Sequence, residues 1–290
     1  MTTASGHDPR WMDTRVGGRQ LDVHDRGLQF DLQTLFSRRR ALGLIGLAGL
    51  AATAAACGTE NAGSAVTSGS GTSSAVTPSA AGSADPLIEV PDETAGPYPG
   101  DGSNGPNVLD DSGIVRADIT ASFGATSTAV DGVPLTIQLT VKDAASSAAM
   151  VGAAVYLWHC DTGGKYSMYD NDENYLRGVQ STDASGTVRY TSVFPACYSG
   201  RWPHIHFEVY SDEATAITSG PIVKTSQIAL PQAACSTVYA DSRYPGSAQN
   251  LTRVTLQSDN VFGNDAGVSQ LATMSGDATA GHAAALTIAV

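Results

Sequence analysis

Short segments in which apolar and polar residues alternate are the feature that most limits the fold of this chain. Residues 134–142 read PLTIQLTVK, which places the leucines, the isoleucine and the valine on one face of a strand. Similar strand segments are expected at residues 153–161, 188–193, 204–210, 223–230 and 284–290. No segment keeps a helical period for about twelve residues, and only residues 231–240 predict a short helix.

Turn-rich segments separate the strands, among them DTGG at 161–164 and DASG at 183–186. With 31 Gly, 13 Pro and 15% charged residues, the composition suits a loop-rich β protein better than a helical bundle. We therefore predict a mainly β fold, an antiparallel β-sandwich with long functional loops. The net charge of −12 argues against a nucleic-acid partner, which would need clustered lysines and arginines.

The N-terminal region carries features of export. Residues 37–57 read SRRRALGLIGLAGLAATAAAC, in which three arginines precede 16 uncharged residues and a cysteine. This order predicts a secretory signal, and the apolar run is shorter than the roughly 20 residues that span a bilayer. The Ser37-Arg38-Arg39 start resembles a twin-arginine signal, and the residues before Cys57 are similar to a lipoprotein cleavage box with Ala54 where leucine is usual.

Three regions follow from these features. Residues 1–57 are expected to be the export signal, 58–86 a flexible linker of mostly Ser, Gly, Thr and Ala, and 87–290 the folded domain. Lipidation of Cys57 would place the domain on the extracellular face of the membrane, with the lipid as its only membrane contact. The alternative is an ordinary cleaved signal and secretion.

The segment RWPHIHF at 201–207 carries the strongest local signal. His204 and His206 are two residues apart on a strand, so both imidazoles point to one face and can reach one metal ion. Two surface histidines would give the same pattern. A cupin-like site would also need a glutamate further along the chain, and Glu208 lies closer than that site requires.

Two longer stretches resemble the intradiol ring-cleavage dioxygenases, which cleave catechols and protocatechuate with non-haem ferric iron. The stretches are LWHCDTGGKYS at 157–167 and LRGVQSTDASGTVRYTSVFPACYSGRWPHIHFEV at 176–209, and a Gly-Pro-Tyr entry stands within ETAGPY at 93–98. The resemblance covers roughly residues 90–230. Its elements occur in family order: Tyr166, Arg177-Gly178, Thr182-Asp183, Gly186, Pro195, Tyr198, Arg201, His204 and His206.

The resemblance implies an Fe(III) site whose ligands are Tyr166, Tyr198, His204 and His206. A phenol has a pKa of about 10 and becomes a ligand at neutral pH beside a strong Lewis acid. Anionic oxygen donors also favour Fe(III) over Fe(II). The implied reaction opens a catechol-type aromatic diol between its hydroxyl-bearing carbons. Both atoms of O2 enter a cis,cis-muconate-type product.

Further roles are implied for residues around the iron. Tyr198 would leave the metal when substrate binds, and Arg201 would stabilise negative charge on the ring. Gln227 resembles the family's catalytic glutamine, although it follows the second histidine by 21 residues, so we expect an inserted loop at 211–221. A surface salt bridge would also explain Arg201. Tyr98, Asp161, Gln180 and Arg201 are expected to line the substrate pocket, although ordinary packing or turn chemistry would explain the first three equally well.

Two alternatives to the enzyme remain at this stage. One is a β-sandwich binding module without turnover, and the other is a cupin-like metalloenzyme. Oligomeric assembly is expected only from the resemblance, because the sequence indicates no interface. If Cys57 is lipidated, then Cys160, Cys197 and Cys235 allow one disulfide and one free thiol, with the pairing open.

Overall fold

The computed structural model describes residues 15–16, 19–20 and 87–290. The predicted lipidation site at Cys57 and nearly all of the predicted signal and linker lie outside these residues, so those predictions stay predictions. In the described part of the chain, no helix is long and apolar enough to cross a bilayer. The short pair β1 (Arg15–Val16) and β2 (Arg19–Gln20) is antiparallel.

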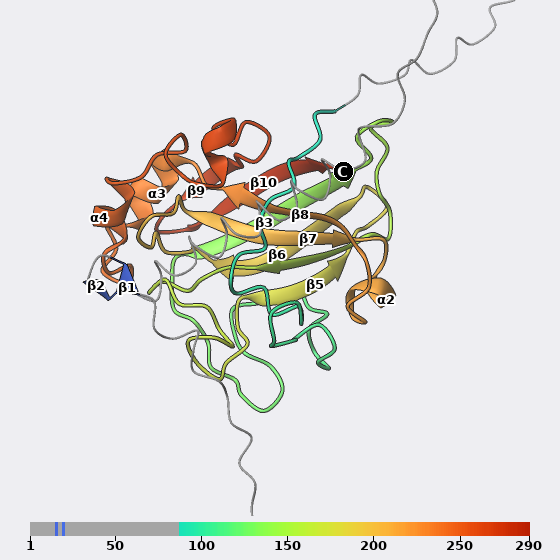
Figure 1. Cartoon of the computed structure of the whole chain (residues 1–290), viewed down its shortest axis with the longest axis horizontal. Helices are drawn as coiled ribbons and strands as arrows, with labels where there is room; N and C mark the ends of the chain where they lie inside the picture. Colours follow the sequence, from blue (N-terminus) through green and yellow to red (C-terminus); the bar gives the residue numbers. More distant parts are fainter. Residues whose placement is uncertain (1–14, 17–18, 21–86) are drawn as a thin grey trace, which may run out of the picture.

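Two four-stranded sheets form the domain (Figure 1). The first has the order β6-β3-β10-β9 and the second the order β5-β4-β7-β8. Their strands are β3 (Pro134–Lys142), β4 (Ala154–Trp158), β5 (Arg177–Ser181), β6 (Thr187–Val193), β7 (His204–Tyr210), β8 (Ile222–Ala229), β9 (Thr273–Asp277) and β10 (Gly281–Ala289). The mainly β, antiparallel prediction is confirmed. One pairing adds to it, because β3 and β10 run parallel.

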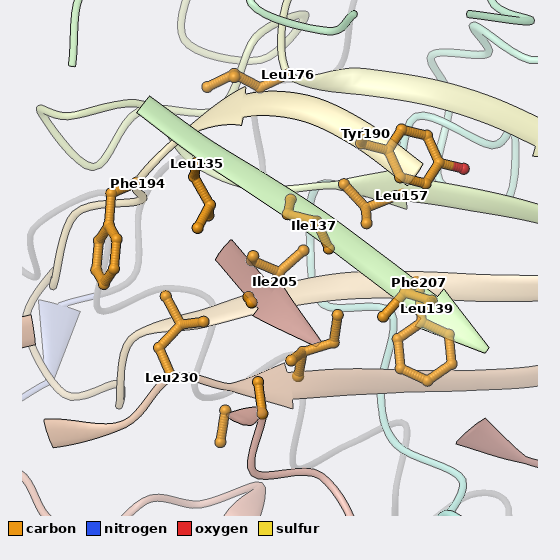
Figure 2. Close-up of a cluster of buried hydrophobic side chains, with 14 of the residues drawn as sticks. Leu135, Ile137, Leu139, Leu157, Leu176, Tyr190, Phe194, Ile205, Phe207 and Leu230 are labelled. Atoms are coloured by element: carbon orange, nitrogen blue, oxygen red, sulfur yellow. The ribbon is translucent and has the colours of Figure 1, made fainter. Parts of the chain in front are cut away.

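The main core lies between the two sheets. Figure 2 shows Leu135, Ile137 and Leu139 of β3 gathered with Ile205 and Phe207 of β7. Alternate residues of β3 are buried, as its sequence pattern predicts. Apolar area removed from water at this layer is the main driving force that holds the sheets together.

The sheet β5-β4-β7-β8 is also covered on its outer face. All five residues of β4 and all seven of β7 are buried. A second apolar cluster on this face contains Tyr156 and Trp158 of β4 together with Val108, Leu109 and Ile114 of the preceding loops. Because side chains alternate along β7, its two histidines lie on the face opposite Ile205, under these loops.

Short helices occupy the two ends of the sandwich. The expected helix forms as α3 (Gln232–Val238) beside α4 (Ser247–Leu251), and the turn η3 (Phe262–Asn264) follows. At the other end, α2 (Glu213–Ala216) lies in the expected insertion between β7 and β8 (Figure 1).

The three described cysteines are buried free thiols, so the one disulfide that their number allows is not formed among them. Each sulfur instead lies near a different backbone carbonyl: Cys160 near Ala196, Cys197 near Arg201 and Cys235 near Leu230. The thiols are thus packed as small apolar side chains, Cys197 and Cys235 in the core between the sheets and Cys160 in the second cluster.

Candidate metal centre

Two phenols and two imidazoles meet on the covered face of the sheet. The Tyr198 hydroxyl is 3.0 Å from His204 Nε2, and the Tyr166 hydroxyl is 3.2 Å from His206 Nε2. The two hydroxyls are 3.4 Å apart, and Tyr166 is 3.5 Å from His204 Nε2. Ligands that each stand about 2 Å from one ion are about 3 Å from one another. The four donor atoms therefore have the spacing of a shared metal ion.

The β7 strand fixes both histidines. His206 pairs in register with Trp158 of β4, and the two rings stack with centroids 4.9 Å apart at an interplanar angle of 8°. His204 Nδ1 donates to the Trp202 carbonyl at 2.6 Å, which leaves the Nε2 lone pair directed at the phenols. A hydrogen bond of this kind orients a metal-binding histidine and sets its tautomer.

Burial keeps the imidazoles in the form that binds metals. Desolvation lowers the pKa of His204 well below 6.5, and the positive charge of Arg201 acts in the same direction. The pKa of His206 is lowered by burial, then by His204 and Arg201. Both rings are therefore neutral at physiological pH, and neutral imidazole is the ligand form.

Burial has the opposite consequence for the phenol of Tyr166. It raises the Tyr166 pKa well above 10, and the neighbouring Tyr198 adds to this effect. A phenolate at this position therefore needs a strong cation beside it. Two such oxygens with two neutral nitrogens suit a hard trivalent ion, so the donor set fits Fe(III).

The cupin-like alternative lacks its carboxylate. Across residues 87–290, no three His, Cys, Asp or Glu side chains form a group that could hold a metal. Glu208 is buried, and its Oε2 accepts a hydrogen bond from the Tyr210 hydroxyl at 2.7 Å. The phenols are thus essential to any metal site built on His204 and His206.

Arg201 and Gln227 lie beside the four donors. Gln227 pairs with His206 across β7 and β8, is fully buried, and accepts a hydrogen bond from Arg201 Nη2 at 2.6 Å. Arg201 Nη1 is 3.4 Å from His204 Nε2. Arg201 also forms an ion pair with Asp259, but the pair is buried, so the alternative of a surface salt bridge is wrong. The longer spacing before Gln227 is taken up by the α2 connection.

The other three predicted pocket residues, Tyr98, Asp161 and Gln180, have different positions. The Tyr98 ring is 5.0 Å from that of Tyr166, so it does lie at the site. Asp161 instead organises the turn before Tyr166, because Oδ1 accepts from the amides of Gly163 and Lys165 and Oδ2 accepts from the Tyr175 hydroxyl.

Gln180 is directed away from the site, which corrects the sequence-based expectation. It pairs in register with Val155, whose side chain belongs to the core between the sheets. Directly paired residues in an antiparallel ladder share a face, so Gln180 faces the sandwich interior. Arg177, three residues earlier on β5, is on the face that carries the site.

Arg177 is a site residue whose role sequence reasoning missed. Arg177 is 1% exposed, and its guanidinium makes five hydrogen bonds. They reach Ser167 Oγ and its carbonyl, the carbonyls of Tyr98 and Pro99, and the Tyr156 hydroxyl. Arg177 thus ties the loop that carries Tyr166 to the loop that carries Tyr98. The sequence feature that could have pointed to this role is the Arg177-Gly178 element of the family resemblance.

Two carboxyl groups were also missed. Asp259 comes from the C-terminal part of the chain, where no motif pointed to it. Glu93 opens the Gly-Pro-Tyr entry segment, and its buried Oε1 has no hydrogen-bond partner. Burial raises the pKa of Glu93 to about 8, although the nearby Arg201 opposes the shift.

Comparisons with known proteins bear on the fold. No protein-family model matches the chain, and no curated protein sequence matches it. An intradiol ring-cleavage dioxygenase from Tetranychus urticae is similar in structure, with 23% identity, a TM-score of 0.51, and coverage of 62% of this chain and 87% of that one. The structure of a dioxygenase designated Tetur07g02040 has 22% identity and a TM-score of 0.56, covering 70% and 94%. The chain therefore has the fold of these solved dioxygenase structures.

Proposed function

We propose that the protein is a non-haem Fe(III)-dependent intradiol dioxygenase. Its reaction would combine a catechol-type diol with O2 and open the ring between the two hydroxyl-bearing carbons. A cis,cis-muconate-type diacid would form, both oxygen atoms would enter the product, and no external reductant would be consumed. The observation that carries the proposal is the convergence of two phenol oxygens and two imidazole nitrogens, which four contacts of 3.0–3.5 Å join into one cluster. The fold shared with solved dioxygenases supports it.

The chain's residues have distinct tasks in this proposal. Tyr166, Tyr198, His204 and His206 would hold the iron. Bound ferric iron supplies Lewis acidity, which acidifies the diol and draws electron density from its ring. Tyr198 is the donor nearest solvent, and its oxygen can take a proton from the incoming diol. Arg201 supplies a fixed positive charge where negative charge develops on the ring.

The exposure of the four donor residues supports entry of a small substrate beside Tyr198. Tyr166, His204 and His206 are 1–3% exposed, whereas Tyr198 is half-buried and the next two residues are exposed. The ring of Tyr98 packs against that of Tyr166, with centroids 5.0 Å apart. An aromatic diol entering along this route meets the Tyr198 oxygen first.

The test is the colour and oxygen uptake of the purified protein. Tyrosinate bound to Fe(III) should give a visible charge-transfer band that catechol shifts, together with catechol-dependent O2 consumption. Tyr166→Phe should remove the band or the iron while the fold stays intact. Tyr190→Phe is the matched control, since its buried hydroxyl donates to the Val155 carbonyl, away from the donors.

Other results would point to the alternatives. Colourless protein with stoichiometric zinc would overturn the ferric site. Iron-bearing, coloured protein without O2 uptake across a panel of catechols would favour the binding module. We also propose that the domain acts outside the cell, either anchored through a lipid on Cys57 or secreted. The sequence of residues 37–57 supports this location.

A further inference from the structure

We propose that Asp259 is a positioning residue for ring cleavage, one that fixes Arg201 so that its Nη1 faces the four-donor cluster. The inference rests on the proposed function for the role of that cluster. This role would make the segment around Asp259, in which the sequence analysis found no motif, a functional part of the site. Asp259 lies between the sheet and the turn η3, and its side chain is fully buried.

The Asp259 carboxylate is held from several sides. Oδ2 accepts hydrogen bonds from Arg201 Nε at 3.0 Å and from the Trp202 amide at 2.6 Å. Oδ1 accepts from the amides of Val261 and Phe262 at 2.8 and 3.1 Å. A carboxylate with both oxygens engaged in this way cannot rotate without losing several hydrogen bonds, so it is a rigid anchor for the arginine.

The Arg201 guanidinium is consequently fixed in its plane. Its Nε donates a hydrogen bond to Asp259, and its Nη2 donates one to Gln227 Oε1 at 2.6 Å. The Gln227 side chain is itself anchored, because its Nε2 donates to the Thr94 carbonyl at 2.9 Å. With two groups of the rigid fork engaged, the position of Nη1 follows, 3.4 Å from His204 Nε2.

Asp259 also supplies the counter-charge that lets Arg201 remain buried. Burial of a lone guanidinium is costly, and a paired carboxylate offsets much of that cost. Glu93 is a second carboxyl group close to Arg201, and its raised pKa keeps it mainly protonated at neutral pH. Asp259 therefore balances the charge of Arg201 and sets its direction at the same time.

The activity test is Asp259→Asn in the full-length iron-loaded protein. The new side-chain amide places its N–H groups against N–H donors that the carboxylate now accepts from. We therefore expect kcat/KM for catechol to fall by about tenfold or more, while the resting charge-transfer band is retained. Asp241→Asn is the matched control, because Asp241 pairs with Arg243 at the surface, and kcat/KM should stay unchanged. In an Arg201→Lys background, Asp259→Asn should cause less than about a twofold further loss, since residues acting as a unit are not additive. An equal loss in both backgrounds, or an active Asp259→Asn enzyme, would overturn the proposal.

A second measurement does not depend on turnover. In protein loaded with diamagnetic Ga(III), the Arg201 Nε–H signal, identified by its loss in Arg201→Lys, should exchange with solvent about tenfold faster or more in Asp259→Asn. Unchanged exchange would show that Asp259 does not hold the guanidinium. If the wild-type protein binds no iron and consumes no O2, the proposed function fails, and the same exchange measurement on the metal-free protein, which is also diamagnetic, still decides whether Asp259 fixes Arg201.

Discussion

The buried carboxyl of Glu93 should make the stability of the protein depend on pH. Its backbone amide donates to the Thr225 carbonyl at 2.9 Å, which fixes the residue against β8. The residue is 5% exposed, and Oε1 has no hydrogen-bond partner. Burial raises the Glu93 pKa from 4.5 to about 8; Arg201 opposes the rise, while Asp265 and Asp259 add to it. The perturbation that we consider is Glu93→Gln.

The magnitude follows from the two pKa values. In the unfolded chain Glu93 loses its proton near pH 4.5, whereas the folded protein keeps it until about pH 8. The folded state therefore binds more protons between these values, and its stability falls as the pH rises through this window and levels off above it. Since one pKa unit is worth about 1.36 kcal/mol, the full cost is up to about 5 kcal/mol. Glutamine carries no such cost.

Urea unfolding of the wild type and Glu93→Gln, at several pH values from about 5 to 8.5, measures this effect. The stability advantage of Glu93→Gln should be small at the acidic end and grow to several kcal/mol at the alkaline end. Glu213→Gln, on the short helix α2, controls for the loss of one carboxylate. If the Glu93→Gln advantage were the same at every pH, the argument that burial holds the proton on Glu93 would be refuted.

Three further substitutions test the packing around the site, the iron binding and the membrane anchoring of the protein. Arg177→Gln should lower the free energy of unfolding, measured in urea, by about 3 kcal/mol or more. The change leaves buried carbonyls without the hydrogen bonds that Arg177 donates to them. Gly96→Ala should weaken iron binding in a chelator competition, since φ is +73° and the new methyl would stand 3.2 Å from His206 Cε1. Gly124→Ala, at φ +79° with open space, should carry only the backbone strain. Cys57→Ser should release the protein into the medium in a fractionation assay if lipidation anchors it; unchanged membrane retention would oppose that.

Strands with strong alternation could be predicted closely, and those without it could not. The strand β3 begins and ends where its pattern predicts. The strand β9 has the sequence TMSGD, with no buried residue and a glycine, so nothing in its own residues indicates a strand. It forms because five of the neighbouring residues of β10 pair with it. Such a strand is set by a partner that local sequence does not contain.

The candidate site shows the same division. The four donors lie within about forty residues in tight motifs, and the structure brings them together as expected. Gln180 was expected in the pocket because the sequence analysis did not include β5 among its strands. On this strand Gln180 lies three residues after Arg177, so the two side chains point to opposite faces and only Arg177 is on the face of the site. Asp259 reaches Arg201 from 58 positions away, a contact that only the packed tertiary structure creates.

The four donors are held unequally, and this bears on how a substrate could replace one of them. His204 and His206 belong to the fully buried strand β7. Tyr166 is 1% exposed, its amide donates to Asp170 at 2.7 Å, and its neighbour Ser167 is bound by Arg177. Tyr198 is half-buried and followed by two exposed residues, so moving it disturbs the least packed structure. In the proposed reaction one protein donor gives way to substrate, which would need three rigid donors and one that moves at low cost, and on that ground Tyr198 would be the exchanging donor.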